Sequence, residues 1–414
     1  MASFVRRVLT TATLAFFTLF AQPSLSADPI RIGYIDPFSG PFAQGGDASL
    51  KEFRFIIDYI NAKGGALGRK FELVTFDDKQ QPAEALIALK SVTDQNLPFV
   101  MSCVGSNIGA ALVDAVSKHN ARNPDNRLLQ LNCGQLASEL TNEQCIFWHF
   151  RFIGSVEMRA VARIKSLPQS VKKVYLLNQD YLFGQSIDRD TKRFLKQYRP
   201  DIEIVADEFI PLMQVKDFAP YITKIKASGA QSLVTGNYGP DLNLLIKAGV
   251  DAGLGIRYDA YLAQVIGAAT AIGSAGDGRL TSVMEAHDNI PTEEHNAEAE
   301  EVIQKWRATH DFGFAVPGLT QFEMLVRAIN QAGSTDAVKV ALALEGMEQK
   351  DLFGQTNIMR KEDHQLLQPY YEAVFTKNVK YDVENTGLGW KTEARTTTAD
   401  ETLPTTCKMK RPSS

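Results

Sequence analysis

The sequence predicts an α/β protein of two lobes, each a doubly wound parallel β-sheet with helices on both faces. Short apolar runs alternate with longer segments of helical periodicity along most of the chain, as in repeated strand–helix units. The alternation pauses near residue 134 and then starts again, which indicates a second sheet. The length of 414 residues, with 44% hydrophobic and 22% charged residues, suits two globular domains.

The first half of the chain contains four predicted strands and three predicted helices. The strands are "IRIGYI" (30–35), "KFELVTF" (70–76), "PFVMSCVG" (98–105) and "RLLQLNCG" (127–134). The helices are expected over 48–62, 83–96 and 106–120. "PFSGPFAQGGD" (37–47) joins the first strand to the first helix. A turn of this composition exposes backbone N–H groups at a helix N-terminus, where small anions bind.

The second half repeats the scheme and then departs from it. Strands are expected over 172–179, 202–210, 230–237 and 257–263, and helices over 152–167, 186–200, 218–229 and 239–253. Two later amphipathic helices (294–312 and 318–333) and a hairpin (356–375) follow. The segment after about residue 385 is rich in Thr, Pro and charge, so we expect it to be loosely ordered.

Residues 1–27 predict a cleaved signal peptide. Arg6 and Arg7 precede the apolar stretch "LTTATLAFFTLFA", and small residues follow. The stretch is too short for a comfortable membrane span, which argues against the alternative of an uncleaved anchor. No cysteine lies at the junction to take a lipid. We expect cleavage after Ser26 or Ala27, export, and no direct membrane anchor.

Charge and motifs exclude several classes of function. Loss of two arginines with the signal peptide takes the formal net charge from −4 to −6. Mildly acidic, dispersed charge argues against a nucleic-acid partner and against a basic membrane-binding surface. The sequence has no GxSxG, HExxH, phosphate-loop or EF-hand motif, and its six histidines lack metal-ligand spacing. We therefore expect neither an enzyme, nor a cofactor, nor a metal.

The four cysteines are Cys103, Cys133, Cys145 and Cys407. In an oxidising compartment an even number predicts up to two disulfides, and four cysteines allow three pairings. None lies in a CxxC motif, which argues against a redox pair or a zinc ribbon. Two bridges, or one bridge with two buried thiols, both fit this composition.

Loops that follow the predicted strands share a mixture of glycine, polar and aromatic residues. They include "YIDPFSG", "CVGSNIG" and "NCGQLAS" in the first half and "LNQDYLFGQ", "TGNYGP" and "YLAQVIG" in the second. Ligands of open α/β sheets bind outside the carboxyl ends of the strands. Two such edges that face each other would form a cleft for a small molecule.

Motifs in residues 39–78, with a later one at residues 105–106, resemble those at the opening of the periplasmic Leu/Ile/Val-binding protein family. They are the SGPxAxxG loop, the INAxGGxxGxKxxLxxxDD run and the "GS" before a helix. "NQDYLFGQ" and "TGNYGPD" are similar to the loops of the family's second lobe, and the resemblance covers about residues 28–377. It implies the type I periplasmic binding fold, in which three hinge crossovers join the lobes, and a solute-binding role for an ABC permease and ATPase.

The resemblance also implies how the chain is divided. Crossovers fall near "WHFRF", "TSVME" and "PYYEAVF". The implied division is a signal peptide (1–27), a first lobe (28–148 and 283–366), a second lobe (149–282 and 367–395) and a C-terminal tail (396–414). We expect a periplasmic monomer. The alternative kept open is a periplasmic sensor module that reports a ligand to a signalling partner.

Ligand contacts are carried over from the family at eight positions. The resemblance implies that these are Ser106, Asn107, Gly134, Gln135 and Leu136 in the first lobe and Phe183, Tyr238 and Gln264 in the second. The Ser106 hydroxyl and N–H would bind a ligand carboxylate, although a serine there could also simply cap the helix. Phe183 and Tyr238 could close over the ligand or belong to the core.

Two positions depart from the family pattern. Gln264 stands where amino-acid-binding members place a Glu against the ligand ammonium, and Gly45 stands where they place an aromatic residue. A neutral amide does not balance a buried ammonium. The departure favours a larger carboxylic acid without an α-amino group, such as an aromatic acid, and a hydrophobic amino acid stays the alternative that the resemblance implies. If the alignment is shifted, Asp259 or Asp241 could substitute.

The implied crossovers also suggest a disulfide pattern. Cys145 lies beside the first crossover, and the tail that carries Cys407 could fold back to it. We expect Cys145–Cys407, with Cys103–Cys133 between neighbouring strand ends.

Overall fold

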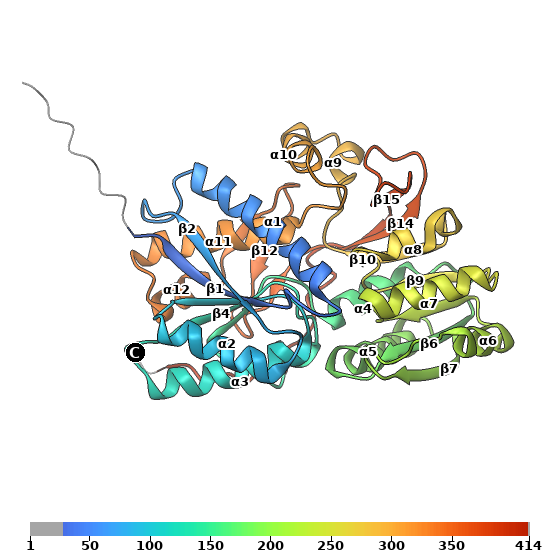
Figure 1. Cartoon of the computed structure of the whole chain (residues 1–414), viewed down its shortest axis with the longest axis horizontal. Helices are drawn as coiled ribbons and strands as arrows, with labels where there is room; N and C mark the ends of the chain where they lie inside the picture. The colour runs from blue at the N-terminus through green and yellow to red at the C-terminus, as the bar shows by residue number, and fades with distance from the viewer. Residues whose placement is uncertain (1–27, 413–414) are drawn as a thin grey trace, which may run out of the picture.

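The computed structural model describes residues 28–412, so the predicted signal peptide lies outside the described residues. Two β-sheets with their helices form two lobes that lie side by side (Figure 1). Between residues 28 and 412, no helix has the length and apolar character needed to cross a membrane.

The first lobe is built on a five-stranded parallel sheet in the order β2–β1–β3–β4–β5. Its strands are β1 (Ile30–Asp36), β2 (Phe71–Asp77), β3 (Phe99–Ser102), β4 (Leu129–Asn132) and β5 (His149–Arg151). β1 and β3 are almost continuously buried, as expected of central strands whose two faces are both covered by helices.

Helices cover both faces of this sheet (Figure 1). α2 (Pro82–Asp94) and α3 (Ser106–Arg122) contact each other on one face. α1 (Ala43–Ala62) packs on α11 (Val316–Ala332) on the other, and α12 (Ala337–Leu344) packs on α11. α10 (Ala297–Arg307) follows the short helix α9 (Ile290–Glu293), and its Trp306 enters the core of the lobe.

The helix after β1 begins at Ala43 rather than at residue 48, so this expectation was wrong. The glycine-rich stretch therefore forms the first turn of α1. A glycine is required at position 46, because a Cβ there would lie 2.0 Å from the carbonyl oxygen of Pro37. The close approach of the preceding chain, and not a flexible loop, accounts for this part of the motif.

The second lobe is built on a seven-stranded sheet in the order β15–β14–β10–β9–β8–β6–β7. The parallel strands are β6 (Lys173–Gln179), β7 (Glu203–Ile210), β8 (Ser232–Thr235), β9 (Arg257–Ala260) and β10 (Leu280–Met284). The antiparallel strands are β14 (Tyr371–Thr376) and β15 (Gly389–Arg395). The surrounding helices are α4 (Val156–Ser166), α5 (Leu182–Tyr198), α6 (Ala219–Ser228), α7 (Gly239–Asp251) and α8 (Ala268–Ile272).

Strand pairing differs from the expected division of the chain at two points. Residues 149–151 were assigned to the second lobe, but β5 pairs with β4 in the first sheet. Val283 and Met284 were assigned to the first lobe, but they pair with β14 in the second sheet. The hinge segments therefore lie a few residues beyond the expected boundaries.

The predicted hairpin over 356–375 is present only in part. β12 (Thr356–Met359) pairs antiparallel with β13 (Leu366–Leu367), and β11 (Glu348–Lys350) completes a small third sheet. β14, which covers the last part of the predicted hairpin, instead belongs to the seven-stranded sheet of the second lobe.

The tail after β15 is ordered against the first lobe, which corrects the expectation of loose structure. Thr398 Oγ1 donates to the carbonyl of Thr356 at 2.8 Å, and the Thr406 N–H donates to Asn142 Oδ1 at 3.2 Å. Arg411 forms an ion pair with Glu345. The chain thus passes between the lobes a fourth time after its three crossovers.

Both expected disulfides are confirmed. Cys103–Cys133 joins the loops after β3 and β4, with the Cα atoms 4.5 Å apart. Cys145–Cys407 fastens the tail to the segment before β5, with a Cα separation of 5.7 Å. The alternative of two buried thiols was wrong.

Candidate functional site

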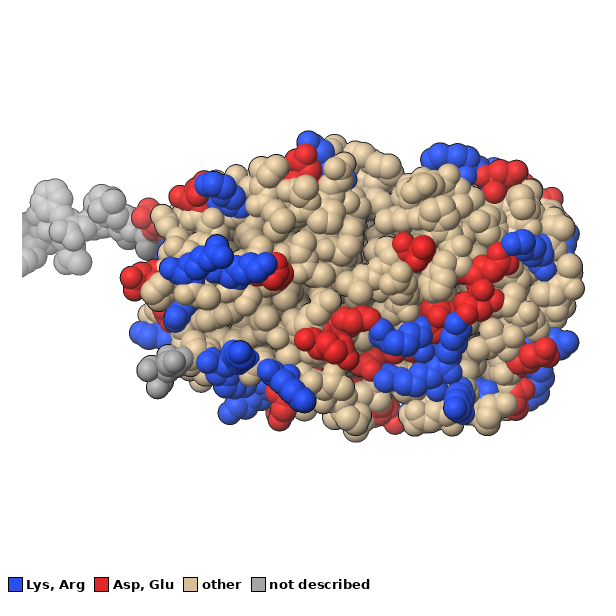
Figure 2. All heavy atoms as spheres, turned by 90° about the horizontal axis from the view of Figure 1, so that it is seen from below, with Lys and Arg blue, Asp and Glu red and all other residues tan. Residues whose placement is uncertain are grey.

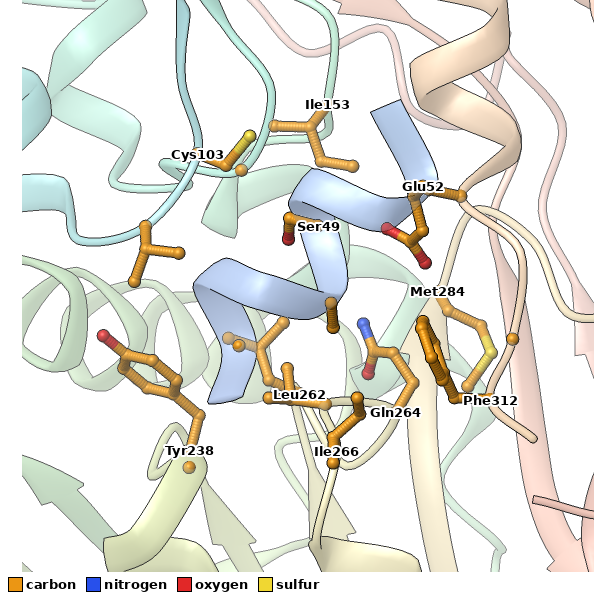
Figure 3. A pocket seen from close by; sticks show the side chains of 18 of the residues that line it. Ser49, Glu52, Cys103, Ile153, Tyr238, Leu262, Gln264, Ile266, Met284 and Phe312 are labelled. Atoms are coloured by element: carbon orange, nitrogen blue, oxygen red, sulfur yellow. The ribbon is translucent and has the colours of Figure 1, made fainter. Parts of the chain in front are cut away.

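A cavity of about 330 Å³ lies between the two lobes, at the carboxyl ends of the strands of both sheets. Its wall comes from α1, from the loops after β3 and β4, and from the loops after β6, β8 and β9. The crossover after β10, the loop before α11 and the turn between β14 and β15 complete it. Side chains from both lobes point into this space (Figure 3).

The N-terminus of α3 forms the polar end of the first-lobe wall. Gly105 is the N-cap residue, in a left-handed conformation with φ 85°, and Ser106 is the first helical residue rather than the cap. The first N–H groups of a helix have no partner within the helix. Ser106 Oγ accepts the Ala137 N–H at 3.1 Å, so the hydroxyl hydrogen of Ser106 can still be donated.

Side-chain hydrogen bonds hold these loops in place. Asp36 accepts the N–H groups of Cys103 at 3.1 Å and Val104 at 2.9 Å. Asn132 Oδ1 accepts those of Gly134 and Gln135. Cys103–Cys133 then joins the two loops covalently. The polar end of the cavity is therefore pre-formed before any ligand binds.

Not every expected contact lines the cavity. Ser106, Gly134 and Leu136 of the first lobe do so, as do Phe183, Tyr238 and Gln264 of the second. Asn107 and Gln135 do not. Gln135 instead turns beneath α3, where its Nε2 donates to Ser102 Oγ at 2.7 Å.

Aromatic residues close the cavity from the second lobe. Tyr238 stacks on Phe42 of the first lobe, with ring centroids 5.3 Å apart, and its ring meets Phe183 edge-on. Phe42 and Leu136 pack into the same buried apolar cluster as these second-lobe residues. The lobes are therefore closed on each other in this structure.

Gln264 presents its amide nitrogen to the cavity (Figure 3). Its Oε1 accepts the Ser282 hydroxyl at 2.6 Å, which fixes the orientation of the amide. The side chain therefore offers a hydrogen-bond donor at the place where a Glu would offer a negative charge.

Sequence reasoning missed the face of α1 that lines the cavity. Gly45, Ser49 and Glu52 follow one another at helical spacing along this face. The Glu52 carboxyl points into the cavity, toward Phe312 and the amide of Gln264 (Figure 3). Burial, and secondly the neighbouring Asp288, raise the pKa of Glu52 well above its ordinary value. The helical spacing of these three residues can be read from the sequence, but a predicted helix that starts at residue 48 does not include Gly45.

The end of the cavity next to Glu52 combines aromatic and acidic residues. Phe312, Phe314, Tyr381 and Trp390 contribute apolar surface. Asp288 Oδ1 accepts the Phe314 N–H at 2.9 Å, and burial raises the pKa of Asp288 to about 6.

A buried ion pair lies where the crossovers meet the cavity. Arg159 of α4 and Glu285 approach within 2.5 Å, and Glu285 also accepts the Gly154 N–H at 3.0 Å. A Cβ at position 154 would lie 1.4 Å from the Tyr370 hydroxyl, so the glycine allows the first and third crossovers to touch. Gln365 adds a second link, because Nε2 donates to the Ile153 carbonyl at 2.8 Å.

The match to a family model decides the classification: residues 29–379 fit the family described as periplasmic binding protein. The chain belongs to this family. A Leu/Ile/Val-binding protein homolog 4 from Brucella melitensis biotype 1 is 27% identical over 410 residues, which are 96% of this chain and 97% of the relative. A leucine-, isoleucine-, valine-, threonine- and alanine-binding protein from Pseudomonas aeruginosa is 27% identical over 78% of this chain and 84% of its own.

Solved structures agree with this classification. The closed conformation of a leucine-, isoleucine-, valine-, threonine- and alanine-binding protein from Brucella ovis has a TM-score of 0.81 at 25% identity, covering 93% of this chain and all of that one. A solute-binding protein from Rhodopseudomonas palustris in complex with 4-hydroxybenzoate has a TM-score of 0.75 at 19% identity, covering 89% and 97%, and shows the shared fold.

The protein is therefore a solute-binding protein of the branched-chain amino acid ABC transporter type, not an enzyme, and the family places it in the periplasm. Residues 28–412 contain no cluster of metal-ligating side chains.

Proposed function

We propose that the protein binds a small carboxylic acid with a hydrophobic or aromatic body in the cavity and delivers it to an ABC permease and ATPase. The observation that carries the proposal is the unpartnered start of α3. There the Ser106 hydroxyl and free N–H groups, at the positive end of a 17-residue helix, face a mostly apolar cavity. A carboxylate fits such a terminus without a full counter-charge.

Gln264 supports an acid that lacks an α-amino group. Because Ser282 occupies the amide oxygen, the group that faces the ligand is a donor. A donor suits a hydroxyl or carboxyl oxygen of the ligand and leaves an ammonium unpaired. The rest of the ligand would be held by apolar burial, at about 25 cal/mol per Å² removed from water.

Binding then follows a hinge mechanism. The ligand docks on the pre-formed first-lobe wall, and the second lobe closes over it with Tyr238 and Phe183. Closure is a shift in population, so only contacts made by the closed form favour it. A permease would recognise this closed arrangement.

A thermal-shift screen of aromatic acids, aliphatic acids and branched-chain amino acids tests the ligand class, because a bound ligand raises apparent stability. Calorimetric titration of Ser106→Ala with the best acid should then show at least a tenfold loss of affinity, consistent with the loss of a charge-assisted hydrogen bond of about 1.5–3 kcal/mol. Ser117→Ala, on the same helix but outside the cavity lining, is the matched control. Unchanged affinity in Ser106→Ala, or leucine as the best ligand, would contradict the proposal.

Delivery is tested with the permease and ATPase reconstituted in vesicles. The liganded protein should stimulate ATP hydrolysis, and the ligand should accumulate inside. Binding without uptake would favour the sensor role.

A further inference from the structure

We infer that the ligand carries a cationic group at the end away from its carboxylate, and that Glu52 of α1 binds this group. The inference rests on the proposed function and deepens it, because it turns a small carboxylic acid into an acid with a distal ammonium.

Glu52 is a carboxyl group without a partner. No hydrogen bond or ion pair joins it to another of residues 28–412, and its carboxyl points into the cavity (Figure 3). An uncompensated carboxylate on an apolar wall is costly, so such groups are normally paired or neutral. A ligand cation would supply the missing partner.

The surroundings of Glu52 increase the negative character of this end. Asp288 is close enough to raise the pKa of Glu52. The Arg307 guanidinium lies 3.6 Å from the Asp288 carboxylate and 3.7 Å from the Asp382 carboxylate. It also donates a hydrogen bond to the carbonyl oxygen of Asp382. One guanidinium therefore serves two other carboxylates, and Glu52 forms no ion pair with any of residues 28–412.

Aromatic rings complete the pattern of a cation site. The Glu52 carboxyl points toward the side of the cavity that carries Phe312 (Figure 3), and Phe314, Tyr381 and Trp390 also line the cavity. The faces of such rings attract cations by about 0.5–2 kcal/mol. Carboxyl and aromatic groups together suit an ammonium better than a second carboxylate, which Glu52 would repel.

The position of Glu52 separates the two charges of the ligand. Figure 3 shows Glu52 on the right of the cavity and Tyr238 and Cys103 on the left, and Cys103 precedes Ser106 by three residues. An ω-amino acid, whose charges lie at its two ends, therefore suits this arrangement better than an α-amino acid, whose charges are one carbon apart.

The probes are 4-(aminomethyl)benzoate and 4-methylbenzoate, which share a carboxylate and a ring and differ in the ammonium. Calorimetric titration of the mature wild-type protein should show at least a tenfold preference for the ammonium compound. In Glu52→Gln the preference should fall below twofold, while 4-methylbenzoate keeps its affinity. Asp58→Asn, at an exposed position of the same helix outside the cavity lining, is the control and should keep the preference.

A second readout comes from proton release. Burial raises the pKa of Glu52, so ionisation of its carboxyl group against the ammonium of 4-(aminomethyl)benzoate should release protons into the buffer. The observed enthalpy should then depend on the ionisation enthalpy of the buffer in the wild type but not in Glu52→Gln.

The outcomes separate the two proposals. Equal affinity for both probes in the wild type, with a loss in Ser106→Ala, would overturn the role of Glu52 and leave the carboxylate site standing; this result does not depend on the folding of the Glu52 variant. Binding of benzylamine that requires Glu52 but not Ser106 would support the cation site and contradict the carboxylate site. Binding of no probe would overturn both.

Discussion

Two pairs of buried carboxyl groups, one pair in each lobe, differ in whether a cation lies beside them. In the second lobe, Asp259 and Glu372 share the buried guanidinium of Arg163. Burial by itself would raise the pKa of Asp259, but Arg163 and Arg257 hold it below its ordinary value. Burial raises the pKa of Glu372 to about 7 in spite of Arg163, because Asp259 adds repulsion.

Asp36 and Asp78 of the first lobe form no ion pair with any of residues 28–412. Burial raises the pKa of Asp36 to about 6, although the Tyr34 hydroxyl and two backbone N–H groups stabilise its charged form. Burial, followed by repulsion from Asp36, raises that of Asp78 to about 7. Asp36 ends β1 and accepts the N–H groups of Cys103 and Val104, in the loop just before Ser106. The second-lobe carboxyl groups are thus balanced by arginine, whereas Asp36 and Asp78 depend on hydrogen bonds or protonation.

The largest effect should come from removing the cation of the second lobe. Arg163→Ala leaves two buried carboxyl groups without their partner, and we expect a loss of about 3–5 kcal/mol in the free energy of unfolding. Urea denaturation followed by circular dichroism measures it. Arg193→Ala, which removes a half-exposed ion pair with Glu157, should cost less than about 1 kcal/mol. Equal losses in both variants would show that Arg163 has no special structural role.

The next effect should come from the disulfide that fixes the first-lobe loops. We expect the double variant Cys103→Ser and Cys133→Ser to lose about 2–4 kcal/mol of stability. It should also bind ligand more weakly, because the loop that carries Ser106 is no longer pre-formed. The matched pair is Cys145→Ser with Cys407→Ser, which should lose stability but keep its ligand affinity. Weaker binding in both double variants would mean that the Cys103–Cys133 bridge has no local effect on the site.

A smaller, pH-dependent effect should distinguish the uncompensated acids. The pKa of Asp78 is about 7 in the folded protein and about 4 when unfolded, so the folded state binds its proton more tightly. This contribution is fully present below pH 4 and is lost as the pH rises to 7. Relative to the wild type, Asp78→Asn should therefore gain about 1–3 kcal/mol between pH 4 and pH 8. Urea titrations at both values test this, and a constant difference would contradict it.

The smallest effect should be on the contact between the lobes. Phe42→Ala removes the stacking on Tyr238, which we expect to weaken ligand binding about three- to tenfold, or about 0.5–1.5 kcal/mol. Small-angle scattering of the free protein should show a larger radius of gyration because the open form gains population. Phe38→Ala, which removes an aromatic contact with Tyr34 inside the first lobe, is the control. The same radius in both variants would show that the stacking does not favour closure.

Much of the fold was predictable because apolar periodicity and glycine-rich strand ends are local signals. The order of strands and helices, and both disulfides, followed from the sequence and the resemblance. The start of α1 was not predictable from composition, since two consecutive glycines disfavour a helix and the close approach of Pro37 that requires Gly46 is a tertiary contact. The assignment of β5 to the first sheet likewise depends on its pairing with β4, and a strand of three residues is too short for its sequence to predict that pairing.

The candidate site was predictable where it consists of strand-end loops. Ser106, Tyr238 and Gln264 all line the cavity, as the carried-over positions imply. The hydrogen bond from the Ser282 hydroxyl to the Gln264 amide oxygen could not be predicted from the sequence, because it depends on the spacing of two strands. Glu52 was missed because a charged residue on an amphipathic helix normally faces solvent, and only the closed lobes show that this one does not.

The return of the tail has a practical consequence for measuring hinge motion. Asp28 is held by Arg69 and Arg411 by Glu345, so both ends of the described chain travel with the same rigid unit. Fluorophores attached to the two termini would keep a constant separation while the protein opens and closes. To measure opening and closing of the lobes, one dye should be attached at a terminus and the other on α6 of the second lobe.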